Sequence, residues 1–143
     1  MDPLSFLPAT WSARLLSLLR IVAAFLFIAH GTQKLLGMPA AEPRDPVPLL
    51  SLLGFAGTLE ALGGLLLLLG LFTRPVAFVL AGEMAVAYLL RHAPQGFWPL
   101  LNHGELAVLY CFLYLYLAAV GGGPWSLDQF RGRAGRAPST GAA

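Results

Sequence analysis

Long runs of apolar residues alternate with short joints that contain proline and polar residues. The runs predict four helices over residues 15–36, 50–72, 75–92 and 102–120, each close to the length that crosses a bilayer core of ~30 Å. Proline occurs in the joints MPAAEPRDPVP, TRP and HAPQGFWP, and it ends helices because it lacks an N–H group and restricts the preceding residue. The third run is short, so we expect the segment RHAPQGFWPLLN to complete the crossing or to fold at the membrane interface.

The composition supports this interpretation. Of the 143 residues, 57% are hydrophobic and 11% are charged, whereas a soluble domain has about 25% charged residues. We therefore predict an all-α, multi-pass protein of the inner (plasma) membrane, with a four-helix transmembrane domain over residues 1–130 and a disordered basic tail over 131–143. The net charge of +2 does not indicate nucleic-acid binding, and a single cysteine, Cys111, excludes an intrachain disulfide and favours simple apolar packing.

The basic residues predict the orientation. If the four spans cross in alternate directions, one side of the membrane receives six lysines and arginines and the other receives three. The larger set is Arg14, Arg20, Arg74, Arg131, Arg133 and Arg136, and the smaller set is Lys34, Arg44 and Arg91. Since basic residues accumulate on the cytoplasmic side, both termini are predicted to be cytoplasmic.

Ionisable residues inside the apolar runs are the candidate functional residues, because such groups are costly in hydrocarbon and mark functional sites. At a rise of ~1.5 Å per residue, all of them fall in the outer half of the predicted bundle. They are His30, Lys34, Glu60, Glu83, His103 and Glu105. We predict that His30, Lys34 and the three glutamates form one connected site in the core, and that Gly57 and Gly64 let a neighbouring helix approach closely.

Simpler roles exist for several of these residues. Lys34 can extend to the interface, His92 and His103 can be ordinary interface residues, and Glu105 can stabilise the start of the fourth helix. Glu60 and Glu83 have no such explanation, so we expect each to be paired, protonated or next to a polar cavity. Because carboxylates outnumber the nearby cations, at least one glutamate is expected to hold a proton at neutral pH. On the fourth helix, spacing places Glu105, Leu109, Phe112 and Tyr116 on one face.

Several segments resemble the DoxX family of small four-span membrane proteins, and together they cover most of residues 20 to 128. They are HGTQKLLG (His30–Gly37), the ExxGG element (Glu60–Gly64), GLFTRP, the third-span Glu83, NHGE (Asn102–Glu105) and GGGPWSLD (Gly121–Asp128). The resemblance implies the four-helix fold. It also implies a link to thiosulfate:quinone oxidoreduction, to catechol or quinone resistance, or to thiol and oxidative-stress complexes. It assigns no catalytic residues.

Three functions stay open from the sequence. The first is a redox membrane subunit in which His30, Glu60 and Glu83 bind a quinone head group or relay protons, with Phe27 and Phe112 as walls. No haem, flavin or iron–sulfur motif is present, so electrons would come from a soluble redox partner or a reduced substrate. The second is a small proton- or cation-coupled transporter, which would form a homo-oligomer. The third is a non-catalytic scaffold that docks redox enzymes on the membrane.

Cofactor and partner expectations follow from these hypotheses. We expect membrane lipid and a quinone or other small hydrophobic ligand as partners, no nucleic acid and no covalently bound cofactor. A haem held by two of His30, His92 and His103 is disfavoured by their predicted positions near the interface. A metal site is disfavoured because di-iron bundles use Glu-x-x-His pairs, and this chain has none.

Overall fold

The computed structural model describes residues 8–40 and 45–134, and every regular element in these ranges is helical. Four helices are long: α1 (Ala9–Leu36), α2 (Leu52–Leu69), α3 (Thr73–Ala87) and α4 (Glu105–Val120). A π-helical turn, η1 (Tyr88–His92), and a 3₁₀ turn, η2 (Ala93–Gln95), continue α3, and a short helix, α5 (Leu127–Ala134), follows α4.

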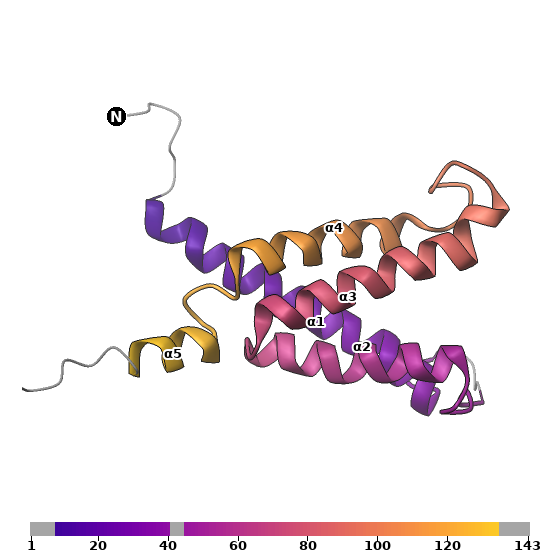
Figure 1. The fold of residues 1–143 in the computed structure, drawn as a ribbon, viewed down its shortest axis with the longest axis horizontal. Helices are drawn as coiled ribbons and strands as arrows, with labels where there is room; N and C mark the ends of the chain where they lie inside the picture. Colours follow the sequence, from indigo (N-terminus) through magenta and orange to yellow (C-terminus); the bar gives the residue numbers. More distant parts are fainter. Residues whose placement is uncertain (1–7, 41–44, 135–143) are drawn as a thin grey trace, which may run out of the picture.

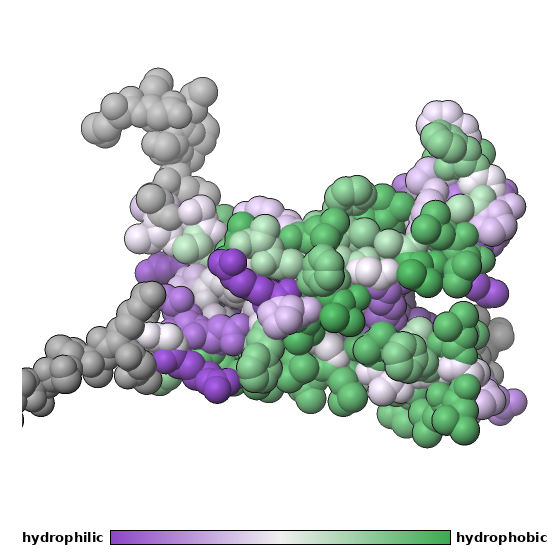
Figure 2. Space-filling model, viewed as in Figure 1, coloured by the Kyte–Doolittle hydropathy of each residue, from purple (hydrophilic) through white to green (hydrophobic). Residues whose placement is uncertain are grey.

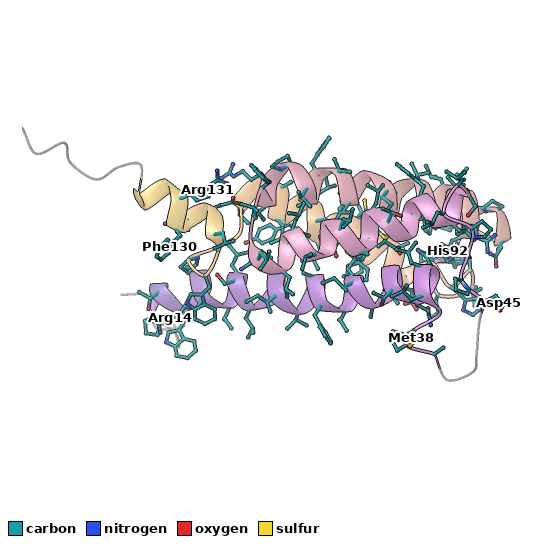
Figure 3. All side chains as sticks on the ribbon, turned by 90° about the horizontal axis from the view of Figure 1, so that it is seen from below. Arg14, Met38, Asp45, His92, Phe130 and Arg131 are labelled. Carbon is teal, nitrogen blue, oxygen red and sulfur yellow. The ribbon has the colours of Figure 1, made fainter. Side chains whose placement is uncertain are left out.

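The long helices form two antiparallel pairs (Figure 1). Helix α1 packs along α2, α3 packs along α4, and contacts between α2 and α3 join the pairs. The start of α1, the α2–α3 joint and α5 lie at one end of the bundle, which we call the terminal end. The α1–α2 and α3–α4 connections lie at the other, the loop end (Figure 1). In Figure 3, Arg14, Phe130 and Arg131 mark the terminal end, whereas Met38, Asp45 and His92 mark the loop end.

The sides of the bundle are apolar. Large hydrophobic side chains such as Phe25, Phe78 and Leu62 are at least 60% exposed, and hydrophobic residues cover much of the flank in Figure 2. The segments Thr10–Leu36, Leu52–Leu69 and Thr73–Gln95 are long and apolar enough to cross a membrane, and α4 is a shorter apolar helix of 16 residues. The prediction of an all-α, multi-pass membrane protein is therefore confirmed.

Local capping explains where the helices begin and end. Ser51 accepts a hydrogen bond from the backbone N–H of Gly54, so α2 begins at Leu52 instead of residue 50. Helix α2 ends at Leu69, three residues before the predicted end at residue 72, because Gly70 adopts a left-handed conformation with φ of 67°. The third helical segment runs past its predicted end at residue 92, because Pro94 lies in the first turn of η2, where no N–H partner is required.

The C-terminal prediction is wrong at its boundary. Residues 131–134, which were expected to begin a disordered tail, belong to α5. The hydroxyl of Ser126 accepts a hydrogen bond from the N–H of Gln129 and thereby caps the start of this helix. The remainder of the predicted tail, residues 135–143, lies outside the described residues.

The core contains small and aromatic side chains from all four long helices. Ala24, Leu67, Ala77, Tyr114 and Leu117 are each fully buried, and Cys111 packs at the edge of this cluster as a partly buried apolar residue. The simple packing role predicted for Cys111 agrees with this position. Small residues in the core bring the helix backbones close together, which favours van der Waals packing in the absence of water.

Glycines set the separation of α1 and α2. A Cβ atom on Gly31 would lie 2.5 Å from the backbone nitrogen of Ala61 and 2.8 Å from the carbonyl oxygen of Gly57. A Cβ atom on Gly64 would lie 2.7 Å from the Ile28 side chain. The close approach predicted for Gly57 and Gly64 is therefore observed, with Gly31 as the opposing contact on α1.

Replacing Gly31 by alanine should force the two helices apart. We expect a loss of about 1–3 kcal/mol in the free energy of unfolding, the usual cost of overpacking, measured by denaturation in detergent. Gly82→Ala is the matched control, because a Cβ atom there meets nothing within 4 Å and alanine is the better helix former. Equal stability of the two variants would contradict the proposed role of the Gly31 contact.

Arg20 joins the terminal ends of three helices. Although it was counted as a flanking charge in the orientation argument, its side chain is fully buried. Its guanidinium donates hydrogen bonds to the carbonyls of Leu67 and Leu68 at the end of α2, and to those of Gly122 and Trp125 after α4. Leu67 and Leu68 lie in the last turn of α2, where the carbonyls carry partial negative charge and need donors.

Candidate functional site

A salt bridge between α1 and α2 forms the centre of the candidate site. The Nζ atom of Lys34, in the last turn of α1, lies 2.5 Å from Oε1 of Glu60 in the middle of α2. Gly57 makes this geometry possible, because the Cβ atom of Lys34 packs over it at the position where a side chain would stand. The Glu60 side chain is 3% exposed and that of Lys34 is 29% exposed, so the carboxylate is enclosed while the ammonium reaches the surface.

Glu83 of α3 brings a second carboxyl group to this ion pair. Both of its carboxyl oxygens are buried and have no hydrogen-bond partner in the described structure, and the same is true of Oε2 of Glu60. Glu83 lies close enough to Glu60 and Lys34 for both charges to act on it. Buried polar atoms are normally hydrogen-bonded, so these three unpartnered carboxyl oxygens make this part of the bundle the candidate functional site.

Two tyrosines of α4 complete the site, and sequence reasoning missed both. Tyr114 is fully buried, its hydroxyl has no partner in the described structure, and it interacts electrostatically with Glu60 and Glu83. Its ring stacks on that of Tyr110 with 5.5 Å between centroids. Phe27 of α1 packs against both rings, at 5.2 Å from Tyr110 and 5.0 Å from Tyr114.

The predicted interior face of α4 is wrong. Leu109, Phe112 and Tyr116 are 63%, 67% and 52% exposed, so they face outward and Phe112 does not wall the site. The buried face consists of Ala107, Tyr110, Tyr114 and Leu117. The spacing of Tyr110 and Tyr114, four residues apart on one helix face, was a signal for this site, but both faces of α4 are rich in aromatic residues and hydropathy does not separate them.

The remaining candidates lie at the margin of the site or outside it. His30 is exposed, and its ring meets that of Tyr110 edge-on with 6.3 Å between centroids. His103 is an exposed loop residue with φ of 58°, and Glu105 is exposed in the first turn of α4. The structure thus groups Lys34, Glu60 and Glu83, places His30 beside Tyr110, and leaves His103 and Glu105 at the surface. Within residues 8–40 and 45–134, no group of three or more His, Cys, Asp or Glu side chains could hold a metal ion.

The third joint is held by its own hydrogen bonds. Nδ1 of His92 lies 2.9 Å from the carbonyl oxygen of Asn102, and the fully buried Asn102 side chain donates to the carbonyl of Gly96 and accepts from the N–H of Gly104. These contacts give His92 a structural role in the loop between α3 and α4.

An apolar helical bundle with an ion pair and orphaned carboxyl groups in its core defines a multi-pass membrane protein with an internal polar site. The chain belongs to the DoxX family, whose family model matches residues 15–93. A protein from Haemophilus influenzae, described as an uncharacterized protein, is 46% identical over 123 residues, which cover 80% of this chain and 88% of the relative. No solved structure matches this chain.

The family match includes part of the site only. Lys34, Glu60 and Glu83 lie within residues 15–93, as does Arg20, whereas Tyr110 and Tyr114 lie beyond them on α4. The resemblance to the DoxX family inferred from the motifs is therefore confirmed, and the assignment of the site rests on the geometry of the four helices.

Proposed function

We propose that this protein is a membrane subunit of a quinone- or thiol/sulfur-linked redox system. We further propose that the site of Lys34, Glu60, Glu83, Tyr110 and Tyr114, called the core site below, binds a quinone head group. The observation that carries the proposal is that buried oxygens of Glu60, Glu83 and Tyr114 have no hydrogen-bond partner in the described structure, while Lys34 pairs with Glu60 and the charges of Glu60 and Glu83 act on Tyr114. A ligand that offers both donor and acceptor oxygens on a flat ring would satisfy these atoms and pack against the aromatic side chains beside them.

The chemistry of the lining residues suits such a ligand. Pockets for small molecules are mostly apolar, with few polar groups that orient the ligand. Here Phe27, Tyr110 and Tyr114 supply aromatic surface, the Tyr114 hydroxyl can donate or accept, and the carboxyl groups can accept hydrogen bonds from a quinol. A buried carboxyl with no donor is best accommodated in the protonated form, so Glu83 is assigned as the proton-holding group. Electrons would pass to or from a soluble redox partner or a reduced substrate.

The proposal includes four crossings of the inner membrane with both termini in the cytoplasm. Helix α4 is about 24 Å long at the standard helical rise, and it lies beside α3 along the bundle (Figure 1). An even number of crossings agrees with the position of α1's start and α5 at one end of the bundle. Setting aside the buried Arg20 and the paired Lys34 leaves five basic residues against two, which keeps the terminal end on the cytoplasmic side.

Replacing Glu83 by glutamine should weaken quinone binding by about two- to tenfold, because the protonated carboxyl group is neutral and a hydrogen bond between neutral groups contributes about 0.5–1.5 kcal/mol. Binding of a short-chain ubiquinone analogue to the full-length protein in detergent can be measured by calorimetry. Glu105→Gln is the matched control, since Glu105 is an exposed carboxylate at the surface of α4.

Two results would overturn the proposal. The wild-type protein could fail to bind the quinone analogue, or Glu83→Gln could bind it as tightly as Glu105→Gln does. Proton uptake into liposomes that contain the protein but no quinone would instead favour a proton-coupled transporter that uses the same carboxyl groups.

A further inference from the structure

A cavity of ≈ 590 Å³ that is lined by both polar and apolar residues lies at the terminal end of the bundle, far from the core site. We call it the polar cavity because it contains the charged side chains of Arg74 and Asp128. It is bounded by Ala13 of α1, Thr73 and Arg74 of α3, the loop of Gly121 to Gly123, and Asp128 of α5. Figure 2 shows hydrophilic residues gathered at this end, next to the hydrophobic flank of the bundle. The two motifs GLFTRP and GGGPWSLD meet here, and the core site does not account for either.

Arg74 is the cation that the cavity presents. Within residues 8–40 and 45–134 its guanidinium forms no hydrogen bond or salt bridge. Its Nε atom lies 3.5 Å from the position that a Cβ atom on Gly121 would occupy, and Gly121 has φ of 87°. A residue with a side chain at this position would be strained by the left-handed backbone conformation, which favours glycine. Arg74 itself is exposed beside this loop.

The other charges around the cavity leave it positive. The two carboxylate oxygens of Asp128 accept hydrogen bonds from the N–H groups of Phe72 and Thr73, each at 2.8 Å. Burial would raise the pKa of Asp128, but these hydrogen bonds and the nearby Arg131 hold that pKa below its usual value. Arg20 lies beneath the loop and donates to the Gly122 carbonyl. The Asp128 carboxylate is thus engaged by backbone donors and by the charges of Arg131 and Arg20, and it does not neutralise Arg74, which favours an oxyanion as the ligand.

An apolar groove of ≈ 480 Å³ lies along the first half of α1, with Tyr116 of α4 at its edge. Its lining residues are Ser12, Leu15, Leu16, Leu18, Leu19, Val22 and Tyr116. Ala13 of the cavity and Leu16 of the groove are three residues apart on α1, and Val120 of the cavity and Tyr116 of the groove are four apart on α4. Each pair therefore lies on one helix face, so the polar cavity and the apolar groove adjoin.

Aromatic and basic side chains at the same end are arranged as in a membrane interface. The guanidinium of Arg131 lies 5.6 Å from the centroid of the Phe72 ring, and that of Arg14 lies 5.9 Å from the centroid of the Trp11 ring. Trp125 and Phe130 are 55% and 76% exposed. Such residues occur at the level of lipid head groups, where aromatic rings and arginines contact phosphates.

We propose that the cavity binds the phosphate group of an anionic phospholipid, with Arg74 as its main ligand and one acyl chain in the groove along α1. The polar cavity and the adjoining apolar groove together match the two parts of a phospholipid. A free phosphate would use the cavity alone and leave the groove without a function.

Native mass spectrometry of the full-length protein can test this assignment. The protein is mixed in detergent with equal amounts of phosphatidylglycerol and phosphatidylcholine that carry the same acyl chains. The wild-type protein is expected to retain phosphatidylglycerol in preference. Arg74→Gln should reduce binding of phosphatidylglycerol about fivefold, the effect of one arginine at an anionic membrane surface. Arg91→Gln, which removes an exposed arginine at the loop end, should bind like the wild type.

A second variant tests the groove. Leu19→Trp fills the apolar groove and should reduce retention of both lipids while Arg74 is intact. Equal binding by Arg74→Gln and Arg91→Gln would overturn the proposal, as would unchanged lipid retention in Leu19→Trp. Inorganic phosphate that competes as effectively as the lipid would also overturn it, because the cavity would then be a site for free phosphate.

Discussion

Replacing Arg20 by methionine should lower the free energy of unfolding by about 2–6 kcal/mol, because two buried carbonyls would lose their donor at a cost of about 1–3 kcal/mol each. Methionine fills similar volume but donates no hydrogen bond. The carbonyls of Leu67 and Gly122 would each lose the arginine as a donor in a buried region. Since these carbonyls belong to α2 and to the loop after α4, we expect the terminal end of the bundle to loosen as a unit.

Denaturation of the purified protein in detergent measures this effect, and proteolysis of the α4–α5 loop provides a second readout. Arg14→Met is the matched control, because Arg14 is an exposed arginine on the same helix, two turns earlier. If Arg20→Met and Arg14→Met unfolded at the same denaturant concentration, Arg20 would not hold the three helices together.

Replacing Lys34 by methionine should destabilise the protein more than replacing Glu60 by glutamine. Lys34→Met leaves the enclosed Glu60 carboxylate without its counter-ion, whereas Glu60→Gln removes a charge and leaves a lysine that can reach the surface. The full cost of an uncompensated buried charge is about 3–5 kcal/mol, and solvent screening at the partly exposed Lys34 reduces the expected loss to about 2–3 kcal/mol.

The double variant separates pairing from individual effects. If the two residues act as a pair, Lys34→Met combined with Glu60→Gln should be more stable than the sum of the single changes predicts, by about 0.5–3 kcal/mol. Thermal unfolding in detergent for the wild type, both single variants and the double variant completes the cycle. Strictly additive effects would show that the salt bridge contributes no coupling and that the carboxyl groups do not depend on Lys34.

The pattern of apolar runs and prolines was sufficient to predict the four long helices and their order, although it did not predict α5. It also identified Glu60 and Glu83 as buried, because a carboxyl group in the middle of an apolar run is too costly to face lipid. The partner of Glu60 followed partly from the sequence, since alternate helix directions bring Lys34 to a similar depth. These features can be predicted because placing a carboxyl group in hydrocarbon costs free energy, and the sequence shows which carboxyl groups lie inside apolar runs.

The tertiary structure decided which face of each helix points inward. On α4 the sequence suggested the face with Phe112 and Tyr116, yet the bundle buries Tyr110 and Tyr114. A membrane helix is apolar on all sides, so no amphipathic stripe marks its interior face, and the rotation of the helix depends on how side chains of several helices fit together.

The position of Arg20 is a second feature that the sequence did not predict. As a basic residue near the start of an apolar run it was predicted to flank the membrane, but its side chain lies buried in the bundle. Only the meeting of the α2 end with the loop after α4 supplies the four carbonyls that satisfy its guanidinium. The sequence by itself thus determined which long apolar segments are helices and which carboxyl groups need partners. The packing of distant segments determined the partners themselves, because hydrogen-bond donors and acceptors far apart in the chain meet only in the folded bundle.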